Sequence, residues 1–238
     1  MVLHRRRPRV RGYPTSPNRA SSMHLRWDPS PLPVREVAVT LEVVKPPEVD
    51  ELYFWALQTS FLDGGRHIGA AHLGLQWYSL HPGGTAVNWG GYGNDGRELE
   101  GEQSSLPSAP GNPNTRDFVW RPRTPYRLRI SGDGDGWWTG SLTDLPAQVT
   151  TVVRRLHGGG GALADPMVWS EVFARCDDPS VVVRWSDLSP RPVGMRPSYQ
   201  THEAGGCANT VSRQAGDAYL QITNTDRETQ RRVGERPD

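Results

Sequence analysis

Apolar side chains at every second position are the feature that most constrains how this chain can fold. The segment Arg35–Val44 reads REVAVTLEVV, with an aliphatic residue at each of positions 37, 39, 41 and 43. This period of two is typical of a strand with one buried face. Similar short runs recur along the chain, separated by many of its 26 glycines and 21 prolines. Short apolar runs separated by glycine and proline favour many strands and turns over long helices.

The strand pattern covers most of the 238 residues. We count about ten strand candidates and no convincing helix, which predicts two packed antiparallel sheets of the jelly-roll type. The segment SGDGDG at 131–136 is typical of a hairpin turn. We expect one β-sandwich domain over residues 35–225, a disordered basic arm over 1–34 with Met23 as an alternative initiator, and a disordered tail over 226–238.

The overall charge argues against two classes of partner. A formal net charge of +1 provides no strong field, so we expect neither nucleic acid nor an anionic membrane as a partner. The basic run at His4–Arg11, HRRRPRVR, leaves a nucleic-acid-binding arm as the alternative. No apolar run reaches the roughly 18–20 residues of a membrane helix, and no apolar stretch follows the basic start as in a secretory signal. We therefore expect a cytoplasmic protein.

Two cysteines, Cys176 and Cys207, allow one disulfide at most. In the cytoplasm we expect reduced thiols. The alternative is a bridge that pins the loop around Cys207 to the strand that ends at Cys176, in a protein exported by another route.

Two segments are expected to lack regular structure. Residues 98–114, ELEGEQSSLPSAPGNPN, are polar and rich in proline, serine and glycine. A loop of this length is usually either functional or disordered, and we expect disorder. Residues 157–166, HGGGGALADP, are expected to form a mobile loop between two strands.

Polar and aromatic side chains concentrate between residues 70 and 93. His72, Gly74 and Gln76 alternate there with Leu73 and Leu75, so one face of this strand is predicted to be apolar while the other meets water or a ligand. The cluster that could bind a ligand comprises Gln76, Trp77, Asn88, Trp89 and Tyr92. Aromatic rings that stack on a sugar, beside amides that bond its hydroxyls, are typical of saccharide sites. The alternative is that both tryptophans are core residues.

A second cluster lies in VWSEVFARC, residues 168–176. Alternation places Trp169, Glu171 and Phe173 on one face, so the Glu171 carboxyl would lie between aromatic rings and have a raised pKa, as a general acid requires. Glycoside hydrolysis needs a second carboxylate, for which Asp187 is the nearest candidate. The alternative is a structural ion pair of Glu171 with an arginine such as Arg184.

Metal and nucleophile patterns are weak. Asp133 and Asp135 alternate as in a calcium loop, but the twelve-residue pattern is missing and a plain turn explains them. His67 and His72 match metal-ligand spacing poorly. Ser170 has no visible histidine partner. We therefore expect no metal, no cofactor and no catalytic residue.

Several motifs together carry a resemblance to a known family. They are LGLQWY, AVNWGGYG, the junction from NTRDFVW to YRLRI, GWWTGSLTDL and VWSEVFARCDDPSVVVRWSDL. They resemble an uncharacterised bacterial domain-of-unknown-function family, and the likeness covers residues 35–225. The resemblance implies a concanavalin-like β-sandwich and transfers no catalytic signature.

The function that these patterns favour is non-catalytic binding of a carbohydrate or a similar polar ligand by Gln76, Asn88, Trp89 and Tyr92, with Trp77, Trp169 and Glu171 as further contacts. Two alternatives stay open. One is a glycan-active hydrolase or lyase that uses Glu171, and the other is a structural or protein-interaction domain. The oligomeric state is not indicated.

Overall fold

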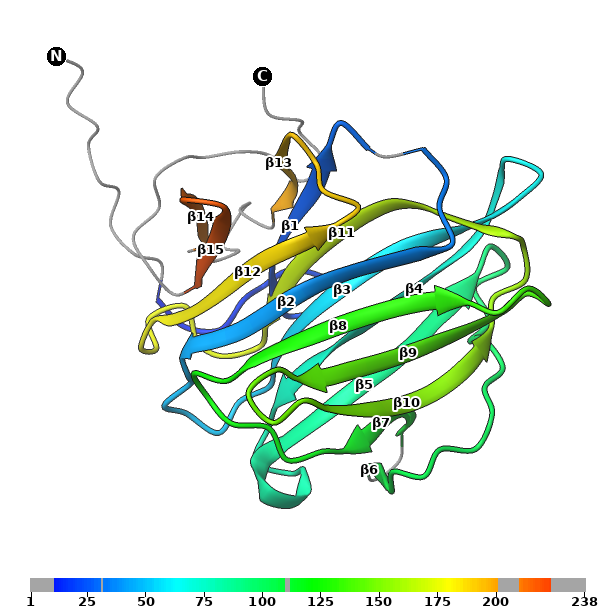
Figure 1. Cartoon of the computed structure of the whole chain (residues 1–238). Helices are drawn as coiled ribbons and strands as arrows, with labels where there is room; N and C mark the ends of the chain where they lie inside the picture. Colours follow the sequence, from blue (N-terminus) through cyan, green and yellow to red (C-terminus); the bar gives the residue numbers. More distant parts are fainter. Residues whose placement is uncertain (1–10, 31, 110–111, 201–209, 224–238) are drawn as a thin grey trace, which may run out of the picture.

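Two antiparallel sheets make up the computed structural model of the chain, which describes residues 11–30, 32–109, 112–200 and 210–223. The strand order is β13-β1-β11-β3-β4-β5-β7-β6 in the eight-stranded sheet and β10-β9-β8-β2-β12-β15-β14 in the seven-stranded sheet (Figure 1). Within the described residues the one helical element is the 3₁₀ turn Pro82–Gly84. The predicted all-β fold with two packed antiparallel sheets is confirmed.

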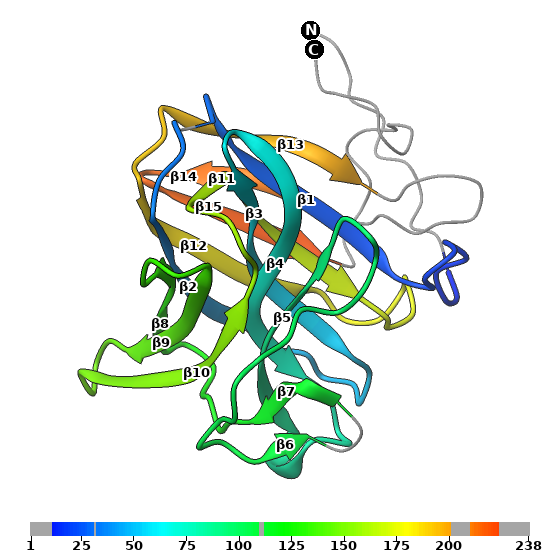
Figure 2. The same ribbon diagram turned by 90° about the vertical axis from the view of Figure 1, so that its right-hand side faces the viewer.

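The eight-stranded sheet carries the features that matter for function. Its strands are β1 (Ser21–Asp28), β3 (Tyr53–Asp63), β4 (Arg66–Trp77), β5 (Thr85–Gly93), β6 (Ser108–Ala109), β7 (Asn112–Asp117), β11 (Ala162–Val172) and β13 (Gly194–Gln200). The seven-stranded sheet consists of β2 (Glu36–Lys45), β8 (Pro125–Gly132), β9 (Trp137–Asp144), β10 (Val149–His157), β12 (Val181–Ser189), β14 (Val211–Ala215) and β15 (Ala218–Thr223). Figure 2 shows β4 and β5 on one side of the sandwich and β8, β9 and β10 on the other.

The core lies between the sheets and follows the period of two. Val37, Val39 and Leu41 of β2 are fully buried, as their alternation predicts. Trp55 and Trp89 enter the same space from the other sheet. A side chain in place of Gly140 on β9 would put its Cβ atom 2.6 Å from the Trp89 ring. A glycine is therefore needed opposite this indole.

The predicted N-terminal boundary is wrong for one segment. Ser21–Asp28 was expected in the disordered arm but forms β1, which pairs with β11 and β13. The reason is visible in the residues, because Met23, Leu25 and Trp27 alternate and each is 1% exposed. Residues 1–10 and the tail 226–238 lie outside the described residues.

The loop at 98–114, expected to be disordered, is anchored to both sheets. Glu98 forms an isolated bridge with Tyr92, and Gly101 forms one with Leu156 of β10. The buried Arg154 donates from Nη1 to the Pro113 carbonyl oxygen over 2.5 Å. These contacts supply the partners that the polar sequence alone does not reveal. The glycine-rich segment 157–166 is also more ordered than expected, since β10 ends at His157 and β11 begins at Ala162.

The cysteine expectation is also wrong. Cys176 is disulfide-bonded, and the chain contains one other cysteine, Cys207, which lies outside the described residues. Asp133, weighed above as a calcium ligand, instead accepts a hydrogen bond from Nε of Arg155 over 2.8 Å. Over the part of the chain that the structure describes, no helix is long and apolar enough to cross a membrane.

Candidate functional site

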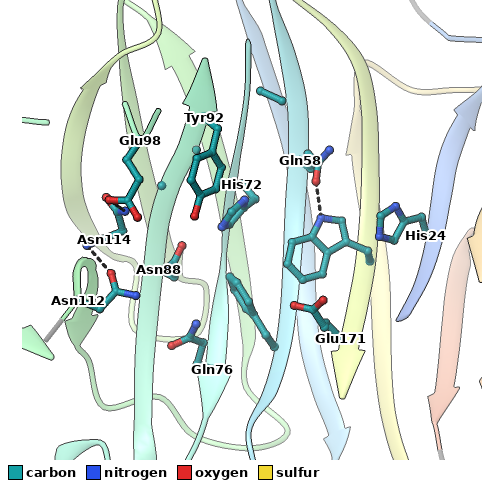
Figure 3. A pocket seen from close by; sticks show the side chains of 15 residues that line it. His24, Gln58, His72, Gln76, Asn88, Tyr92, Glu98, Asn112, Asn114 and Glu171 are labelled. Carbon is teal, nitrogen blue, oxygen red and sulfur yellow. Dashed lines mark hydrogen bonds between the residues drawn. The ribbon is translucent and has the colours of Figure 1, made fainter. Parts of the chain in front are cut away.

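A pocket of about 500 Å³ opens on the outer face of the eight-stranded sheet (Figure 3). Its lining combines carboxamides, carboxyl groups, imidazoles and aromatic rings. The lining residues are His24, Phe54, Gln58, Ala70, His72, Gln76, Asn88, Gly90, Gly91, Tyr92, Glu98, Asn112, Asn114, Trp169 and Glu171. They come from β1, β11, β3, β4, β5 and β7 and from the loop that follows β5.

The strand register creates the hollow. Trp169 of β11 lies opposite Ala56 of β3, which lies opposite Gly74 of β4, and Gly74 lies opposite Asn88 of β5. Two small residues therefore separate the large indole from the amide. Three strand spacings of about 4.8 Å put these two walls about 14 Å apart. The floor between them is low because Ala56 and Gly74 project little from the sheet.

Two further sets of residues, each paired across neighbouring strands, supply more of the polar groups. Glu171, Phe54 and Gln76 lie side by side across β11, β3 and β4. Gln58 and His72 form the next pair on β3 and β4. Side chains of successive residues point to opposite faces of a sheet, so alternate positions on each strand bring these groups to the outer face.

Trp169 is wedged in place and offers little free ring surface. Its ring centroid lies 5.9 Å from His24, 4.8 Å from Phe54 and 5.5 Å from His72. Its Nε1–H donates to Gln58 Oε1 over 2.9 Å, and the residue is 6% exposed. The open aromatic ring of the pocket is instead that of Tyr92, which is 49% exposed.

The two histidines of the pocket are neutral at pH 7. Burial lowers the pKa of His72 to about 4, and a hydrogen bond with the Asn88 side chain opposes part of this shift. Burial also lowers the pKa of His24 to about 4, and the positive charge of Arg26 on the same strand adds to the effect. Neither imidazole therefore contributes a positive charge under ordinary conditions.

Glu171 combines partial burial with neutral hydrogen-bond donors. Its Oε1 accepts from Asn18 Nδ2 over 2.7 Å and from Ser22 Oγ over 3.3 Å. Burial raises the pKa of its carboxyl group, and the two hydrogen bonds oppose this shift. The predicted direction of the pKa shift is therefore confirmed.

The opposite wall is built from amides and a second carboxyl group. Asn88 Nδ2 donates to Thr115 Oγ1 over 2.8 Å, whereas Asn88 Oδ1 is buried and, apart from the His72 imidazole, has no hydrogen-bond partner among the described residues. Asn114 Nδ2 donates to Glu98 Oε2 over 3.3 Å. A Cβ atom at Gly90 would lie 2.8 Å from Asn114 Cβ, so the glycine lets this side chain lie close to β5.

The structure brings together several of the residues singled out from the sequence. Gln76, Asn88, Tyr92, Trp169 and Glu171 all line the pocket. The apolar side of β4 faces inward, as its alternation predicted, because Leu73 and Leu75 are fully buried.

The expected roles of the other two tryptophans are wrong. Trp89 is 0% exposed and lies between the sheets, where no ligand reaches it. Trp77 packs against the core, and its Nε1–H donates to the Val49 carbonyl oxygen over 3.1 Å. Both lie on the inward side of their strands, and that position, rather than residue type, decides what they contact.

The expected partners of Glu171 are also wrong. Asp187 and Arg184 both belong to β12, in the opposite sheet. Arg184 Nη2 instead lies 3.0 Å from Glu42 Oε2. Proximity in sequence was misleading here, because the chain crosses from one sheet to the other between β11 and β12.

Sequence reasoning missed several lining residues. His24 belongs to a segment taken as disordered, and Glu98, Asn112 and Asn114 belong to a loop taken as disordered. Phe54 and Gln58 lie in a run rich in aromatics whose pairing the sequence does not reveal. The length of the 98–114 loop was the available signal, since long loops in compact domains are often functional. Over the described ranges no group of three or more His, Cys, Asp or Glu side chains could hold a metal ion.

Comparisons with known proteins find similar solved structures but no matching family. No family model matches the chain, and no curated protein matches it. Scytalido-glutamic peptidase bound to a transition state analog inhibitor is similar at 10% identity, with a TM-score of 0.48 over 90% of this chain and 97% of that chain. SCP-B, a member of the eqolisin family of peptidases in complex with the tripeptide Ala-Ile-His, is similar at 10% identity, with a TM-score of 0.46 over 85% of this chain and 96% of that chain. At such identities the likeness describes the β-sandwich alone.

Proposed function

We propose that the chain is a binding protein whose outer-face pocket holds a saccharide without hydrolysing it. The observation that carries the proposal is Asn88, which is 4% exposed, lines the pocket and has the His72 imidazole as the one partner of its Oδ1 among the described residues. An amide oxygen can accept two hydrogen bonds, so one acceptor position stays open. A ligand hydroxyl that donates to this oxygen would fill it.

Location distinguishes Asn88 from other buried polar groups. The indole N–H groups of Trp55 and Trp89 have no partner among the described residues, but they lie in the packed core between the sheets. Asn88 lies in a wall that borders open space. Because Oδ1 is itself buried, a ligand hydroxyl reaches it only after a neighbouring side chain shifts.

The rest of the lining suits a polyhydroxylated ligand. A carboxamide both donates and accepts, as a hydroxyl does, and Gln58, Gln76, Asn112 and Asn114 join Asn88 around the cavity. The half-exposed ring of Tyr92 offers an apolar surface for the C–H side of a sugar. The volume of about 500 Å³ lies within the usual range of small-molecule sites.

The carboxyl groups of the pocket argue against glycoside hydrolysis. Glu98 and Glu171 are the carboxyl side chains among its described lining residues, and they lie at opposite sides of it (Figure 3). Because Glu98 pairs with Tyr92 beyond β5, four strand spacings, or about 19 Å, separate its backbone from that of β11, and its row meets β3 at Ser60, six residues from the row of Glu171 at Phe54. The two carboxyl groups of a glycosidase lie roughly 5–10 Å apart. Binding without hydrolysis is the function that this spacing favours.

A glycan-array screen tests the proposal with two pocket variants and one control. Asn88→Ala removes the buried amide, and Tyr92→Ala removes the open ring. Tyr13→Ala is the matched control, because Tyr13 is 53% exposed and lies outside the pocket. We expect the pocket variants to lose the glycan signal of the wild type and Tyr13→Ala to retain it, with circular dichroism verifying that each variant folds.

Two results would refute the proposal. One is a wild-type protein that binds no glycan on the array. The other is glycan binding that both pocket variants retain in full, which would place the ligand elsewhere on the molecule.

A further inference from the structure

The carboxylate of Glu171 has one oxygen that no described residue engages. Both of its hydrogen bonds go to Oε1, from Asn18 Nδ2 and Ser22 Oγ. Both donors are neutral. Among the described residues no lysine, arginine or histidine lies within ion-pair distance of this carboxylate, whereas Glu36 and Glu42 of β2 pair with arginines. The negative charge of Glu171 is therefore not neutralised within the described part of the chain.

The pocket as a whole lacks a positive charge. Its described lining residues include Glu98 and Glu171 and contain no lysine or arginine. His24 and His72 are neutral at pH 7 because burial lowers their pKa values. Arg26 lies on β1 near His24 but is not a lining residue. An anionic ligand would therefore meet repulsion in this pocket.

The surroundings of Glu171 favour a cation. Trp169 lies two residues earlier on the same face of β11, Phe54 lies directly opposite on β3, and each is 6% exposed. A partly buried carboxylate interacts more strongly with a cation than an exposed one does. Within the described residues this end of the pocket thus has a group that attracts a positive charge and none that supplies one.

We infer that the ligand carries a primary ammonium group beside its hydroxyls, and that the Glu171 carboxylate receives this ammonium. The inference rests on the proposed saccharide binding and narrows it to amino-saccharides with a free amine. Hydroxyls of the same ligand would reach Asn88 at the opposite wall. Saccharides that carry carboxylate or sulfate groups are excluded by the two carboxyl groups of the lining.

Titration calorimetry at pH 6 with three matched probes tests the inference. The probes are the β-1,4-linked tetramers of glucosamine, N-acetylglucosamine and glucose, which differ in whether a charged amine is present. A hydrogen bond to a charged group is worth roughly 1.5–3 kcal/mol. We therefore expect the wild type to prefer the glucosamine tetramer about tenfold or more over the other two.

Three variants test which carboxyl group causes the preference for the glucosamine tetramer. Glu171→Gln keeps the shape of the side chain and removes its charge, and we expect the preference for the amine to disappear. Glu98→Gln tests the other carboxyl group of the pocket. Glu100→Gln is the control, because Glu100 is exposed and lies outside the pocket. We expect Glu100→Gln to retain the preference in full and Glu98→Gln to lose less of it than Glu171→Gln does.

The outcomes separate the inference from the function on which it rests. Equal binding of the three tetramers that Tyr92→Ala abolishes would overturn the ammonium inference while saccharide binding stands. A preference that survives Glu171→Gln and is lost in Glu98→Gln would overturn the assignment to Glu171. A protein that binds no saccharide of any kind would overturn both proposals.

Discussion

Replacing His72 with glutamine should flatten the pH dependence of stability between pH 7.5 and 4.5. Burial lowers the pKa of this imidazole from 6.5 to about 4 in the folded protein. In the unfolded chain the imidazole takes up a proton near pH 6.5, whereas in the folded chain it resists protonation until about pH 4. Its neutral form therefore supports the fold fully above pH 6.5, and this support is lost as the pH falls from 6.5 towards 4.

The pKa difference sets the size of the effect. The gap between 6.5 and about 4 corresponds to about 3 kcal/mol once the pH lies below both values. At pH 4.5 most of this loss, about 2.5 kcal/mol, should already be present. Carboxyl groups also titrate in this range, but they titrate in wild type and variant alike. The difference between the two proteins therefore isolates His72.

Urea unfolding at the two pH values measures this difference. We expect the free energy of unfolding of the wild type to fall by about 2.5 kcal/mol more than that of His72→Gln. His67→Gln, an exposed position on the same strand, controls for the general effect of replacing a histidine. Parallel curves for the wild type and His72→Gln would refute the reasoning, because they would mean that burial does not keep the ring neutral.

Three other changes test separate parts of the fold. Gly74→Ala would place its Cβ 2.0 Å from the Trp55 carbonyl oxygen, so we expect urea unfolding to show a loss of about 1–3 kcal/mol, while Gly161→Ala, with nothing within 4 Å, should be nearly neutral. Reducing the disulfide of Cys176 should cost about 2–4 kcal/mol, measured as a lower thermal midpoint with a reductant present. A raised pKa of Glu171 favours its protonated carboxyl in the folded state, so ionisation of this carboxyl lowers the free energy of unfolding as the pH rises through that pKa. We therefore expect Glu171→Gln to raise the free energy of urea unfolding more at pH 7.5 than at pH 4.

Local periodicity predicted which way side chains point. The alternation over β4 placed His72 and Gln76 on one face and Leu73 and Leu75 on the other, and the structure agrees. The same reasoning placed Trp169 and Glu171 together on the outer face of β11. Side-chain direction follows from the pleat of a single strand, so one sequence segment is enough to predict it.

Contacts between distant segments could not be predicted in this way. The pocket depends on β11 lying beside β3, which brings Glu171 opposite Phe54, although more than a hundred residues separate them in the chain. Strand order and register are set by the packing of the whole sandwich. For this reason the sequence suggested Asp187 and Arg184 as partners of Glu171, and both belong to the other sheet.

Residue type also misled where direction should have decided. Trp77 and Trp89 were taken as ligand contacts because tryptophan is typical of saccharide sites, but both project inward. The alternation already placed Trp77 on the apolar side of β4. A large aromatic ring on an inward-facing position belongs to the core, where it packs against side chains of the opposite sheet.

The pocket contains two groups that stability alone does not explain. Asn88 has a buried oxygen with one open acceptor position, and burial makes the charged form of Glu171 less favourable. Apolar residues at both positions would avoid these costs. A ligand of the proposed kind would offset both costs at once, because its hydroxyl would donate a hydrogen bond to Asn88 Oδ1 and its ammonium would donate one to the Glu171 carboxylate. At a hundred times its Kd it should stabilise the wild type by about 2.7 kcal/mol, and the same concentration of glucosamine tetramer should raise the thermal midpoint of Glu171→Gln by clearly less.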